Sequence, residues 1–390
     1  IDEVVDTLKS GWITTGPKTK EFERRLTAYC GNKATLAVNS NTVGLEVVLR
    51  WFGVQEGDEV IVPAYTYCAT ANVIVHCGAK PVMVDVNADD FDVCLENVRR
   101  AITDKTKVIM PVDLGGMPCA YDELFELVET EEVKTLFQAK TEEQRKLGRI
   151  LILSDSAHSI GAEYKGRKAG CLADVSVFSF HAVKNLTTAE GGAIMLNLPE
   201  PFDNEEVYRY LCTYLHGQNK DALAKTKKGA WRYDVLVSGF KGNMTDIMAS
   251  IGLVELSRYE DDTLHYRKCI YDQYTDAFSR YGWAELPIYE TEDRKSSYHV
   301  YCLRVKGITE QQRDEIIQRI FDKDVSVNVH FQPLPLLSAF KNKGYKIEDY
   351  PVAYDNYCRE ISLPVWYGLS EEMVKTVIDA VICSVEEVLA

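Results

Sequence analysis

Short apolar runs alternate with amphipathic segments of helical length from about Lys18 to Asn197. Apolar spacing predicts helices over residues 19–29 and 42–52, the second ending at Gly53. The short runs predict strands over residues 59–62, 81–84, 107–110, 150–153, 174–178 and 192–196. This βαβ alternation predicts an α/β fold with a mainly parallel sheet flanked by helices.

The pattern changes beyond the last of these runs. Residues 123–149 are expected to form a charged helical excursion, and residues 197–244 a polar loop with helical pieces. A long or bent helix is expected over 245–281, followed by a strand at 300–305 and a helix at 309–321. A strand near 325–329 and a closing helix from Ser370 complete the pattern. We therefore expect a large domain over residues 1–250 and a smaller α/β domain over 251–390.

Composition narrows the class of protein. The formal net charge of -15 disfavours nucleic-acid binding, which needs clustered cations against phosphates. The 11 cysteines include no C-x-x-C pair, so neither a zinc site nor a disulfide framework is expected. With no apolar run of membrane-spanning length and no signal peptide, a cytoplasmic protein with reduced thiols is expected. Because Ile1 already lies in a helical pattern, we expect a short additional N-terminal segment in the native protein.

Lys184 is the first candidate for chemistry. It lies between the strands expected at 174–178 and 192–196, shortly before Glu190-Gly191-Gly192. Partial burial at such a junction would lower the pKa of the amine and make it available for a Schiff base. Taken alone, a loop lysine is more often an exposed surface residue. The neighbouring motifs favour the chemical interpretation.

Asp155 ends the apolar run 150–153, and His158 follows three residues later. A carboxylate at the carboxyl end of a parallel strand faces the crevice where α/β proteins bind ligands. Paired with a pyridine nitrogen, it would keep that nitrogen protonated, so that the ring acts as an electron sink. A turn-capping role for Asp155 and a structural role for His158 explain an isolated D-x-x-H equally well.

Two further motifs follow predicted strands or precede predicted helices. Asn39-Ser40-Asn41-Thr42 lies directly before a helix, where side chains and helix N-terminal amides form a ready anion site. Simple N-capping accounts for the same residues. Pro63-Ala64-Tyr65-Thr66-Tyr67 follows the strand at 59–62 and offers an aromatic that could stack on a planar ring. Plain packing is the alternative for this aromatic.

In this order and spacing, the motifs resemble those of the DegT/StrS family of sugar aminotransferases, within the aspartate-aminotransferase fold (fold type I). The resemblance covers almost the whole chain, and its most specific part is the run from Ser179 to Lys184 and Asn185 followed by Glu190-Gly191-Gly192. It implies a pyridoxal 5'-phosphate enzyme. It also implies glutamate as amino donor and a nucleotide-linked keto-sugar as acceptor.

The resemblance assigns roles to single residues. Lys184 matches the lysine that binds the cofactor covalently and moves the proton, and Asp155 matches the partner of the pyridine nitrogen. His158 would bind the phenolic oxygen of the cofactor, and Tyr67 would stack on its ring. The residues that match phosphate holders are Asn41, Thr42 and Ser179.

The resemblance also bears on assembly and substrate. Asn243 matches a residue that the family donates to the phosphate of the neighbouring subunit, which implies a homodimer with shared active sites. His299 and His330 are candidates for substrate contact, with a structural role as the alternative for each. Many relatives carry P-L-H after the position of His330, whereas this chain reads Pro333-Leu334-Pro335. Three cations of the polar loop are candidates for a sugar diphosphate: Lys227, Lys228 and Arg232.

Two other functions remain open at this point. A non-catalytic pyridoxal-phosphate-binding sensor would share the fold, but this chain retains the lysine, the carboxylate and the phosphate motif together. Another fold type I enzyme, such as a sugar dehydratase or a decarboxylase, is the second alternative. Dehydratase relatives replace the lysine with histidine, so Lys184 favours amino transfer.

Overall fold

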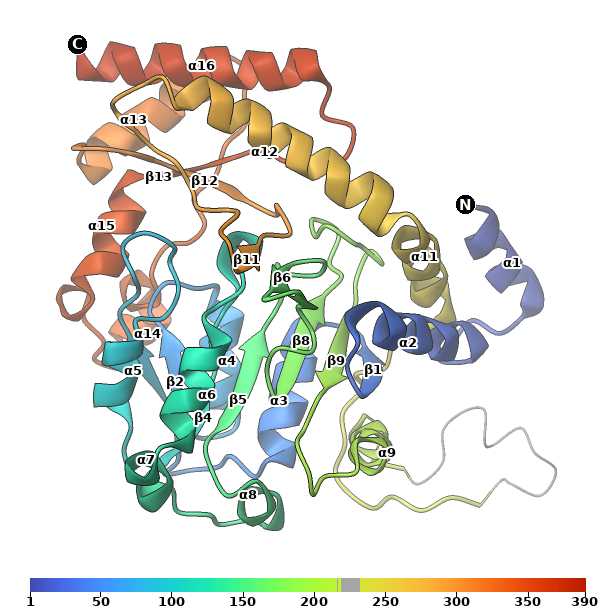
Figure 1. Ribbon diagram of the computed structural model, residues 1–390. Coiled ribbons are helices and arrows are strands. Elements are labelled where there is room, and N and C mark those ends of the chain that lie inside the picture. The colour runs from blue at the N-terminus through green and yellow to red at the C-terminus, as the bar shows by residue number, and fades with distance from the viewer. Residues whose placement is uncertain (216, 219–231) are drawn as a thin grey trace.

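The computed structural model describes residues 1–215, 217–218 and 232–390. Its centre is a seven-stranded sheet with the strand order β1-β9-β8-β5-β4-β2-β3 (Figure 1). The strands are β1 (Ala34–Val38), β2 (Glu59–Pro63), β3 (Lys80–Val84), β4 (Thr106–Ile109), β5 (Leu151–Asp155), β8 (Val175–Ser179) and β9 (Gly192–Leu196).

The sheet is mainly parallel, as expected. The pairs β3–β2, β2–β4, β4–β5 and β5–β8 are parallel, and β9 alone runs antiparallel to its neighbours β8 and β1. Every residue of β1, β4, β5, β8 and β9 is buried. Strands covered on both faces read as continuous apolar runs, which is why the sequence pattern located them.

Helices cover this sheet. In particular, α3 packs against β8 and β9, and α2 packs against β1 and α11. The helices of this part are α1 (Asp2–Ser10), α2 (Pro17–Cys30), α3 (Asn41–Trp51), α4 (Cys68–His76), α5 (Leu95–Ala101), α6 (Tyr121–Glu129), α7 (Glu131–Leu136), α8 (Glu142–Leu147), α9 (Asn204–Tyr214) and α11 (Asp246–Ser257). The excursion expected over 123–149 is thus three short helices. Among the described residues, no helix is long and apolar enough to cross a membrane.

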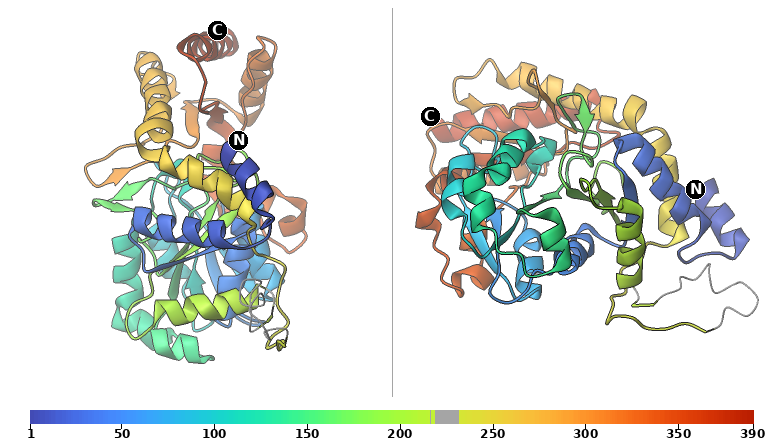
Figure 2. Two further views of the ribbon diagram at one scale, coloured as in Figure 1. Left: turned by 90° about the vertical axis from the view of Figure 1, so that its right-hand side faces the viewer. Right: turned by 60° about the horizontal axis from the view of Figure 1, so that its bottom comes forward.

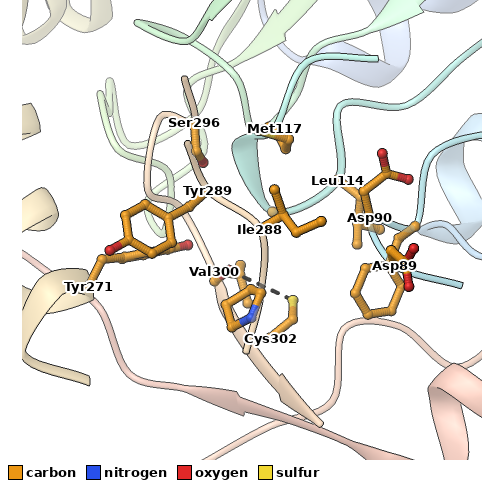
Figure 3. Close-up of a pocket in the computed structure, with 13 residues that line it drawn as sticks. Asp89, Asp90, Leu114, Met117, Tyr271, Ile288, Tyr289, Ser296, Val300 and Cys302 are labelled. Carbon is orange, nitrogen blue, oxygen red and sulfur yellow. Dashed lines mark hydrogen bonds between the residues drawn. The ribbon is translucent and has the colours of Figure 1, made fainter. Parts of the chain in front are cut away.

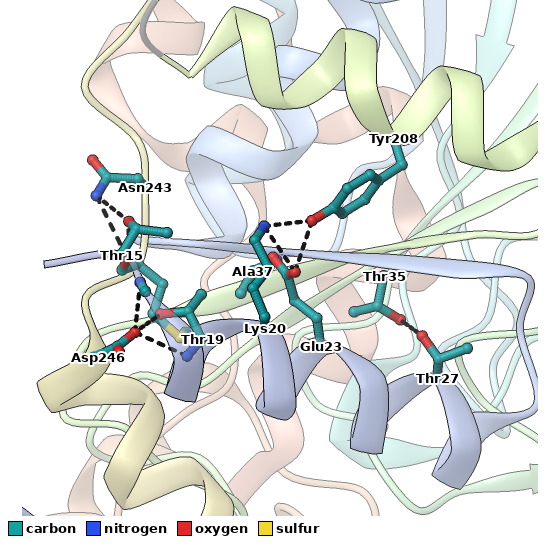
Figure 4. A network of polar contacts seen from close by, with 12 residues as sticks. Thr15, Thr19, Lys20, Glu23, Thr27, Thr35, Ala37, Tyr208, Asn243 and Asp246 are labelled. Carbon is teal, nitrogen blue, oxygen red and sulfur yellow. Dashed lines mark hydrogen bonds and ion pairs between the residues drawn. The ribbon is translucent and has the colours of Figure 1, made fainter. Parts of the chain in front are cut away.

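The start of α2 is held by a distant residue (Figure 4). Asp246 Oδ1, on the first turn of α11, accepts hydrogen bonds from the Gly16 N–H (2.7 Å), the Thr19 N–H (2.9 Å) and the Thr19 hydroxyl (2.6 Å). A carboxylate satisfies free N–H groups there and complements the positive end of the helix dipole. This contact fixes the N-terminal part of the chain to α11.

A second, three-stranded sheet lies above the first in the view of Figure 1, with α12, α13 and α16 around it. Its order is β10-β12-β13, formed by β10 (Ala284–Glu285), β12 (Tyr301–Val305) and β13 (Glu360–Leu363). The helices are α12 (His265–Phe278), α13 (Glu310–Phe321), α14 (Ser338–Lys341), α15 (Pro351–Arg359) and α16 (Glu371–Leu389). A division near residue 250 agrees with the separate sheets and remains our proposal for the domain boundary.

Two segments link these layers. A π-helical turn, η2 (Tyr259–Leu264), joins α11 to α12, so the expected long helix is bent there (Figure 2). A small sheet of β11 (Arg294–Lys295), β6 (Glu163–Tyr164) and β7 (Arg167–Lys168) connects the chain after α12 to the segment after β5. Beside it lies a small cavity of about 20 Å³, bordered by Leu114, Tyr271 and Cys302 (Figure 3). The two parts of the chain are therefore packed directly against each other.

The prediction of a strand over residues 325–329 was wrong. Only Asn328 pairs with the sheet, through an isolated bridge to Ser362 on β13. The alternation of Val325, Val327 and Val329 suggested a strand, but the chain leaves the sheet edge at once and carries His330 towards the cleft between the two sheets. Strands β1 and β13 lie outside the predicted set, as do the two-residue strands β6, β7, β10 and β11.

Candidate active site

The carboxyl ends of the parallel strands open into a cavity of about 370 Å³. Asp155 ends β5, Ser179 ends β8, and Tyr67 follows β2. The cavity brings together most of the residues predicted from sequence: Asn41, Thr42, Tyr67, Asp155, His158, Ser179, Lys184, His299 and His330. These residues are far apart along the chain. The ends of the parallel strands bring most of them together, and His299 and His330 reach the cavity from the chain beyond α12.

The Asp155 carboxylate is buried and held on both oxygens. Its Oδ2 accepts from the Thr70 hydroxyl at 2.7 Å, and its Oδ1 accepts from the Asn41 amide at 3.1 Å and the Ala157 N–H at 3.3 Å. Burial raises the pKa of Asp155, while these hydrogen bonds and the nearby Lys184 oppose the rise. The group is therefore fixed in direction and faces a cationic neighbour.

The N-terminus of α3 forms one wall of the cavity. Ser40 caps the helix by accepting from the Val43 N–H at 3.2 Å. The Asn41 amide is committed to Asp155 and to the carbonyl of Val177 (2.7 Å), so an anion would meet its backbone N–H rather than its side chain. Thr42, in the first turn, also lines the cavity. Free N–H groups at a helix start are a ready anion site.

Gly192 allows β9 to run beneath this helix start. A Cβ built there would lie 2.6 Å from the carbonyl carbon of Ser40 and 2.7 Å from the nitrogen of Asn41. Both are backbone atoms and cannot move aside without shifting α3. The second glycine of the Glu190-Gly191-Gly192 motif therefore has a steric role in placing the anion site.

Lys184 lies in the loop between β8 and β9 and is half-buried. Burial lowers the pKa of its amine to about 8, and the Asp155 carboxylate opposes part of that fall. The neighbouring Asn185 ties the loop to the chain beyond α12. Its amide donates to the carbonyl of Ser297 at 2.6 Å, and its Oδ1 lies 2.8 Å from His299 Nδ1. The loop is thus anchored on both sides of the cleft.

His158 is buried and its tautomer is defined by one contact. Its Nδ1 accepts from the backbone N–H of Gly115 at 3.2 Å, so the proton of the neutral ring is on Nε2. Burial lowers the pKa of His158 well below the usual range, and the cation of Lys184 adds to the effect. His158 is therefore a neutral donor. Gly115 adopts a left-handed backbone (φ 64°), which suits glycine.

Aromatic side chains border the cavity. Tyr67 is 58% exposed although it lines the wall, so a ring face is open to a planar ligand. Phe331 lies 5.7 Å from Tyr67 and 5.8 Å from His158, measured between ring centroids. A flat, partly apolar group could be enclosed between these rings.

A second cleft of about 680 Å³ adjoins the first and shares Val183, Lys184, His299 and His330 with it. Arg267 borders this cleft and is buried. Its Nε and Nη2 donate to the carbonyls of Tyr298 (2.9 Å) and His299 (2.8 Å). Within the described part of the chain, Arg267 has no carboxylate partner. A buried cation without a counter-ion is costly, which favours binding of an anion there.

Other predicted residues lie elsewhere. Asn243 does not line either cavity. Its amide donates to the Thr15 hydroxyl at 2.6 Å (Figure 4), and Lys241 donates to its Oδ1 at 2.6 Å. A contact from Asn243 to a phosphate would therefore have to be made across a subunit interface. Lys227 and Lys228 lie outside the described residues. Arg232 is described, but it lines neither cavity.

Several site residues were not predicted. They are Thr70, Gly115, Asn185, Arg267 and Phe331. Asn185 and Phe331 stand next to predicted residues, which was a usable signal. Thr70 and Arg267 are single residues on helical faces, and no spacing rule singles them out.

The groups that line the cavity fit pyridoxal phosphate. The cavity combines a half-buried amine, a carboxylate held in one direction, a neutral imidazole donor and a helix N-terminus with adjacent hydroxyls. An amine suits the aldehyde, a carboxylate the ring nitrogen, an N–H donor the phenolic oxygen, and the helix start the phosphate.

Comparison with known proteins agrees with this fit. The DegT/DnrJ/EryC1/StrS aminotransferase family matches residues 1–382. The spore coat polysaccharide biosynthesis protein SpsC of Bacillus subtilis (strain 168) is 34% identical, over 98% of this chain and 93% of its own.

Solved structures give the same result. A protein assigned as a sugar aminotransferase from Streptococcus pneumoniae, in its PMP form, is 48% identical, with a TM-score of 0.95, over 99% of this chain and 96% of its own. Its PLP form is 47% identical, with a TM-score of 0.95, over 100% of this chain and 96% of its own. A third similar structure is PseC of Helicobacter pylori, an aminotransferase involved in the biosynthesis of pseudoaminic acid. It is 26% identical, with a TM-score of 0.84, over 99% of this chain and 96% of its own.

Proposed function

Because this chain belongs to the DegT/DnrJ/EryC1/StrS aminotransferase family, whose enzymes use pyridoxal phosphate, we propose that it transfers an amino group from glutamate to a nucleotide-linked keto-sugar. The observation that carries the proposal is the pairing of a half-buried lysine with a fixed carboxylate, Lys184 and Asp155, in one cavity. A sugar substrate agrees with the similarity to the protein of Streptococcus pneumoniae that is assigned as a sugar aminotransferase. Because SpsC is a spore coat polysaccharide biosynthesis protein, we also propose a part in polysaccharide synthesis for this chain.

Pyridoxal phosphate supplies an aldehyde and an electron-withdrawing ring when it is bound. Asp155 holds the proton at the ring nitrogen, since its two oxygens are kept in place by Thr70 and Asn41. His158 donates from Nε2 towards the phenolic oxygen. Tyr67 covers one ring face, and Thr42, Ser179 and the N-terminus of α3 receive the phosphate.

Lys184 would hold the aldehyde group of the cofactor, and its free amine would take up and return the proton at the reacting carbon. This role needs a neutral amine, and a pKa of about 8 makes that form accessible near neutral pH. His299 and His330 lie on the same side as Lys184 and remain neutral, because burial lowers the pKa of both. They do not compete with the lysine for the proton.

The position of Arg267 supports the proposal that the amino donor is acidic. Its guanidinium lines the same cleft as Lys184 and lacks a carboxylate partner among the described residues. We propose that it attracts a carboxylate of glutamate, with charge–charge attraction strengthened by the low polarity of the surroundings.

The size of the larger cleft supports the proposal that the amino acceptor is a sugar. At about 680 Å³ it falls within the range of small-molecule sites, and Trp366 and Tyr367 on its wall are 44% and 42% exposed. Exposed aromatic faces beside a reactive amine suit the apolar face of a sugar ring. The nucleotide part would extend beyond it, and the assembly that we propose is a homodimer in the cytoplasm, with Asn243 serving the partner's site.

The direct test uses the purified enzyme with pyridoxal phosphate, glutamate and a panel of nucleotide keto-sugars. We expect one of them to be converted to the amino sugar, with release of the keto acid. Lys184→Ala should lose both the absorbance band of lysine-bound cofactor and turnover. Normal amino transfer by this variant would refute the assignment of Lys184.

Two observations separate the alternatives. A sensor protein would bind the cofactor, but its spectrum would not change when glutamate is added. A dehydratase or decarboxylase would change the substrate without moving nitrogen, so tracing the ¹⁵N label of glutamate into the sugar product decides between these reactions and amino transfer.

A further inference from the structure

A chain of three polar groups leads from the interior of the second sheet to the cavity. Glu360 and Ser362 are two residues apart on β13, so their side chains share one face of the strand. The Ser362 hydroxyl lies 2.5 Å from Glu360 Oε1 and 2.9 Å from His330 Nδ1. The backbone N–H of His330 also donates to Glu360 Oε2 at 3.0 Å. His330 in turn lines both cavities beside Lys184.

The hydroxyl between the two titratable groups has a single proton, which creates two hydrogen-bonding patterns. If Glu360 is a carboxylate, Ser362 donates to it and can only accept from His330, so Nδ1 carries the imidazole proton. If Glu360 is protonated, it donates to Ser362, which then donates to Nδ1, and the imidazole proton must be on Nε2. A neutral imidazole has one donor and one acceptor nitrogen. The backbone N–H of His330 donates to Glu360 Oε2 (3.0 Å) and lies 3.1 Å from the Ser362 hydroxyl oxygen, so the second pattern applies when Glu360 takes up its proton on Oε1.

We propose that Glu360, acting through Ser362, sets which nitrogen of His330 carries the proton, and thereby whether Nε2 donates or accepts a hydrogen bond beside Lys184. Glu360 and Ser362 are positioning residues in this arrangement, and His330 is the group that meets the ligand. Within the described residues, His330 Nε2 has no protein partner, which leaves it for a bound molecule.

The groups around the relay determine where it switches. Those packed around Glu360 are Arg313 of α13, Arg304 and Cys302 of β12, and Tyr65. Arg313 is paired with Asp314 at 2.7 Å, and Arg304 with Glu285 at 2.8 Å, so neither cation is wholly available to Glu360. Burial raises the pKa of Glu360 to about 8, against the lowering effect of the Ser362 hydroxyl, the His330 N–H, Arg313 and Cys302.

The groups around the imidazole keep it neutral throughout. They are Lys184, His158 and His299. Burial and the cation of Lys184 lower the pKa of His330 to about 4. Because the folded-state pKa of Glu360 is raised, its protonated form dominates below pH 8, where Nε2 is a donor. Above that pH the carboxylate dominates, and Nε2 becomes an acceptor.

The consequence for the substrate rests on the proposed function. A keto oxygen accepts hydrogen bonds and cannot donate, so the form with a proton on Nε2 fits a keto-sugar. The form with a lone pair there would fit a hydroxyl group instead. We expect the KM for the keto-sugar to rise roughly tenfold above pH 8, the scale of one lost hydrogen bond.

The test reads the tautomer directly and needs no substrate. Holoenzyme with ¹⁵N-labelled histidine is titrated by NMR on both sides of pH 8, and the His330 signals are assigned by their absence in His330→Gln. The two ring nitrogens differ strongly in ¹⁵N shift according to which one is protonated. We expect the proton to move from Nε2 to Nδ1 as the pH rises. One unchanged tautomer across the titration would overturn the proposal.

Variants identify the source of the change. Glu360→Gln cannot ionise, and Ser362→Ala breaks the relay, so each should abolish the transition of His330. Glu315→Gln, on the exposed side of α13, is the matched control and should leave the transition in place. A transition that persists in both relay variants would also overturn the proposal. If a variant does not fold, the titration of the unaltered enzyme still decides.

This result is separable from the proposed function. A tautomer transition without amino transfer would leave the relay standing and remove the function. Amino transfer by an enzyme whose His330 keeps one tautomer would do the reverse.

Discussion

At the scale of single residues, hydrogen bonds turn ordinary side chains into directed groups. Asp155 is held by Thr70 and Asn41, and His158 receives its proton position from the N–H of Gly115. In each case a partner that the sequence does not single out determines the direction of a residue that it does. The chemistry of the site therefore depends on neighbours as much as on the reactive groups.

Asp155 allows a graded test of this point. Asp155→Asn should lower kcat by about 10²-fold or more, the scale of losing one electrostatic partner in a buried site. Thr70→Val keeps the shape but leaves Asp155 Oδ2 without its donor, and it should cost roughly tenfold. Steady-state kinetics at saturating cofactor measure both. Equal losses in the two variants would contradict the separate roles.

Lys184 gives a prediction on pH dependence. Its pKa is lowered to about 8, so the neutral amine dominates above that pH and is scarce below it. The rate at which apoenzyme takes up pyridoxal phosphate should therefore rise with pH and level off above about 8. Stopped-flow absorbance measures this rate.

Asp155→Asn provides the control for this pH profile. Because the carboxylate raises the pKa of Lys184, its removal should move the midpoint to lower pH. A midpoint near the ordinary lysine value of about 10.4 in the unaltered enzyme would contradict the burial of the amine.

At the scale of elements, the anion site is a product of close packing between β9 and the start of α3. Gly192→Ala would place a Cβ 2.6 Å from the backbone of Ser40. We expect a loss of about 1–3 kcal/mol in the free energy of unfolding, and weaker binding of pyridoxal phosphate because α3 must shift. Denaturant unfolding and cofactor titration measure the two effects.

Gly282→Ala is the matched control for this change. A Cβ at Gly282 meets no atom within 4 Å, and its backbone does not require glycine. That variant should bind the cofactor normally and unfold within about 0.5 kcal/mol of the unaltered protein. Equal weakening of cofactor binding by both substitutions would rule out the steric role of Gly192.

At the scale of the whole molecule, the homodimer remains a prediction with a specific test. If Asn243 serves the partner's site, Lys184→Ala and Asn243→Ala subunits are each inactive, but a mixed dimer restores one complete site. Dissociation and random reassembly of an equal mixture should recover about a quarter of the full activity, as the symmetry of shared sites requires. Sedimentation measures the assembly and turnover the recovery. No recovery in confirmed mixed dimers would place Asn243 outside the partner's site.

Most of the elements, the family and the reactive side chains could be recognised in the amino-acid sequence. Continuous apolar runs marked β2, β3, β4, β5, β8 and β9, because strands buried on both faces need such runs. The motifs around Lys184 and Asp155 likewise depend on residues that are close in sequence. The fold class, the cofactor and the enzymatic nature are confirmed by the comparisons, whereas the roles of single residues stay predictions.

Only the tertiary structure decided which groups meet across long separations. The strand expected at 325–329 was wrong because a single bridge to β13 replaces a ladder there, and pairing depends on a distant partner rather than on local alternation. The position of Arg267, which has no carboxylate partner among the described residues, and the contact between Ser362 and His330 arise in the same way. Local patterns encode burial and turn geometry, but hydrogen bonds between residues far apart in the chain exist only once the fold has brought them together.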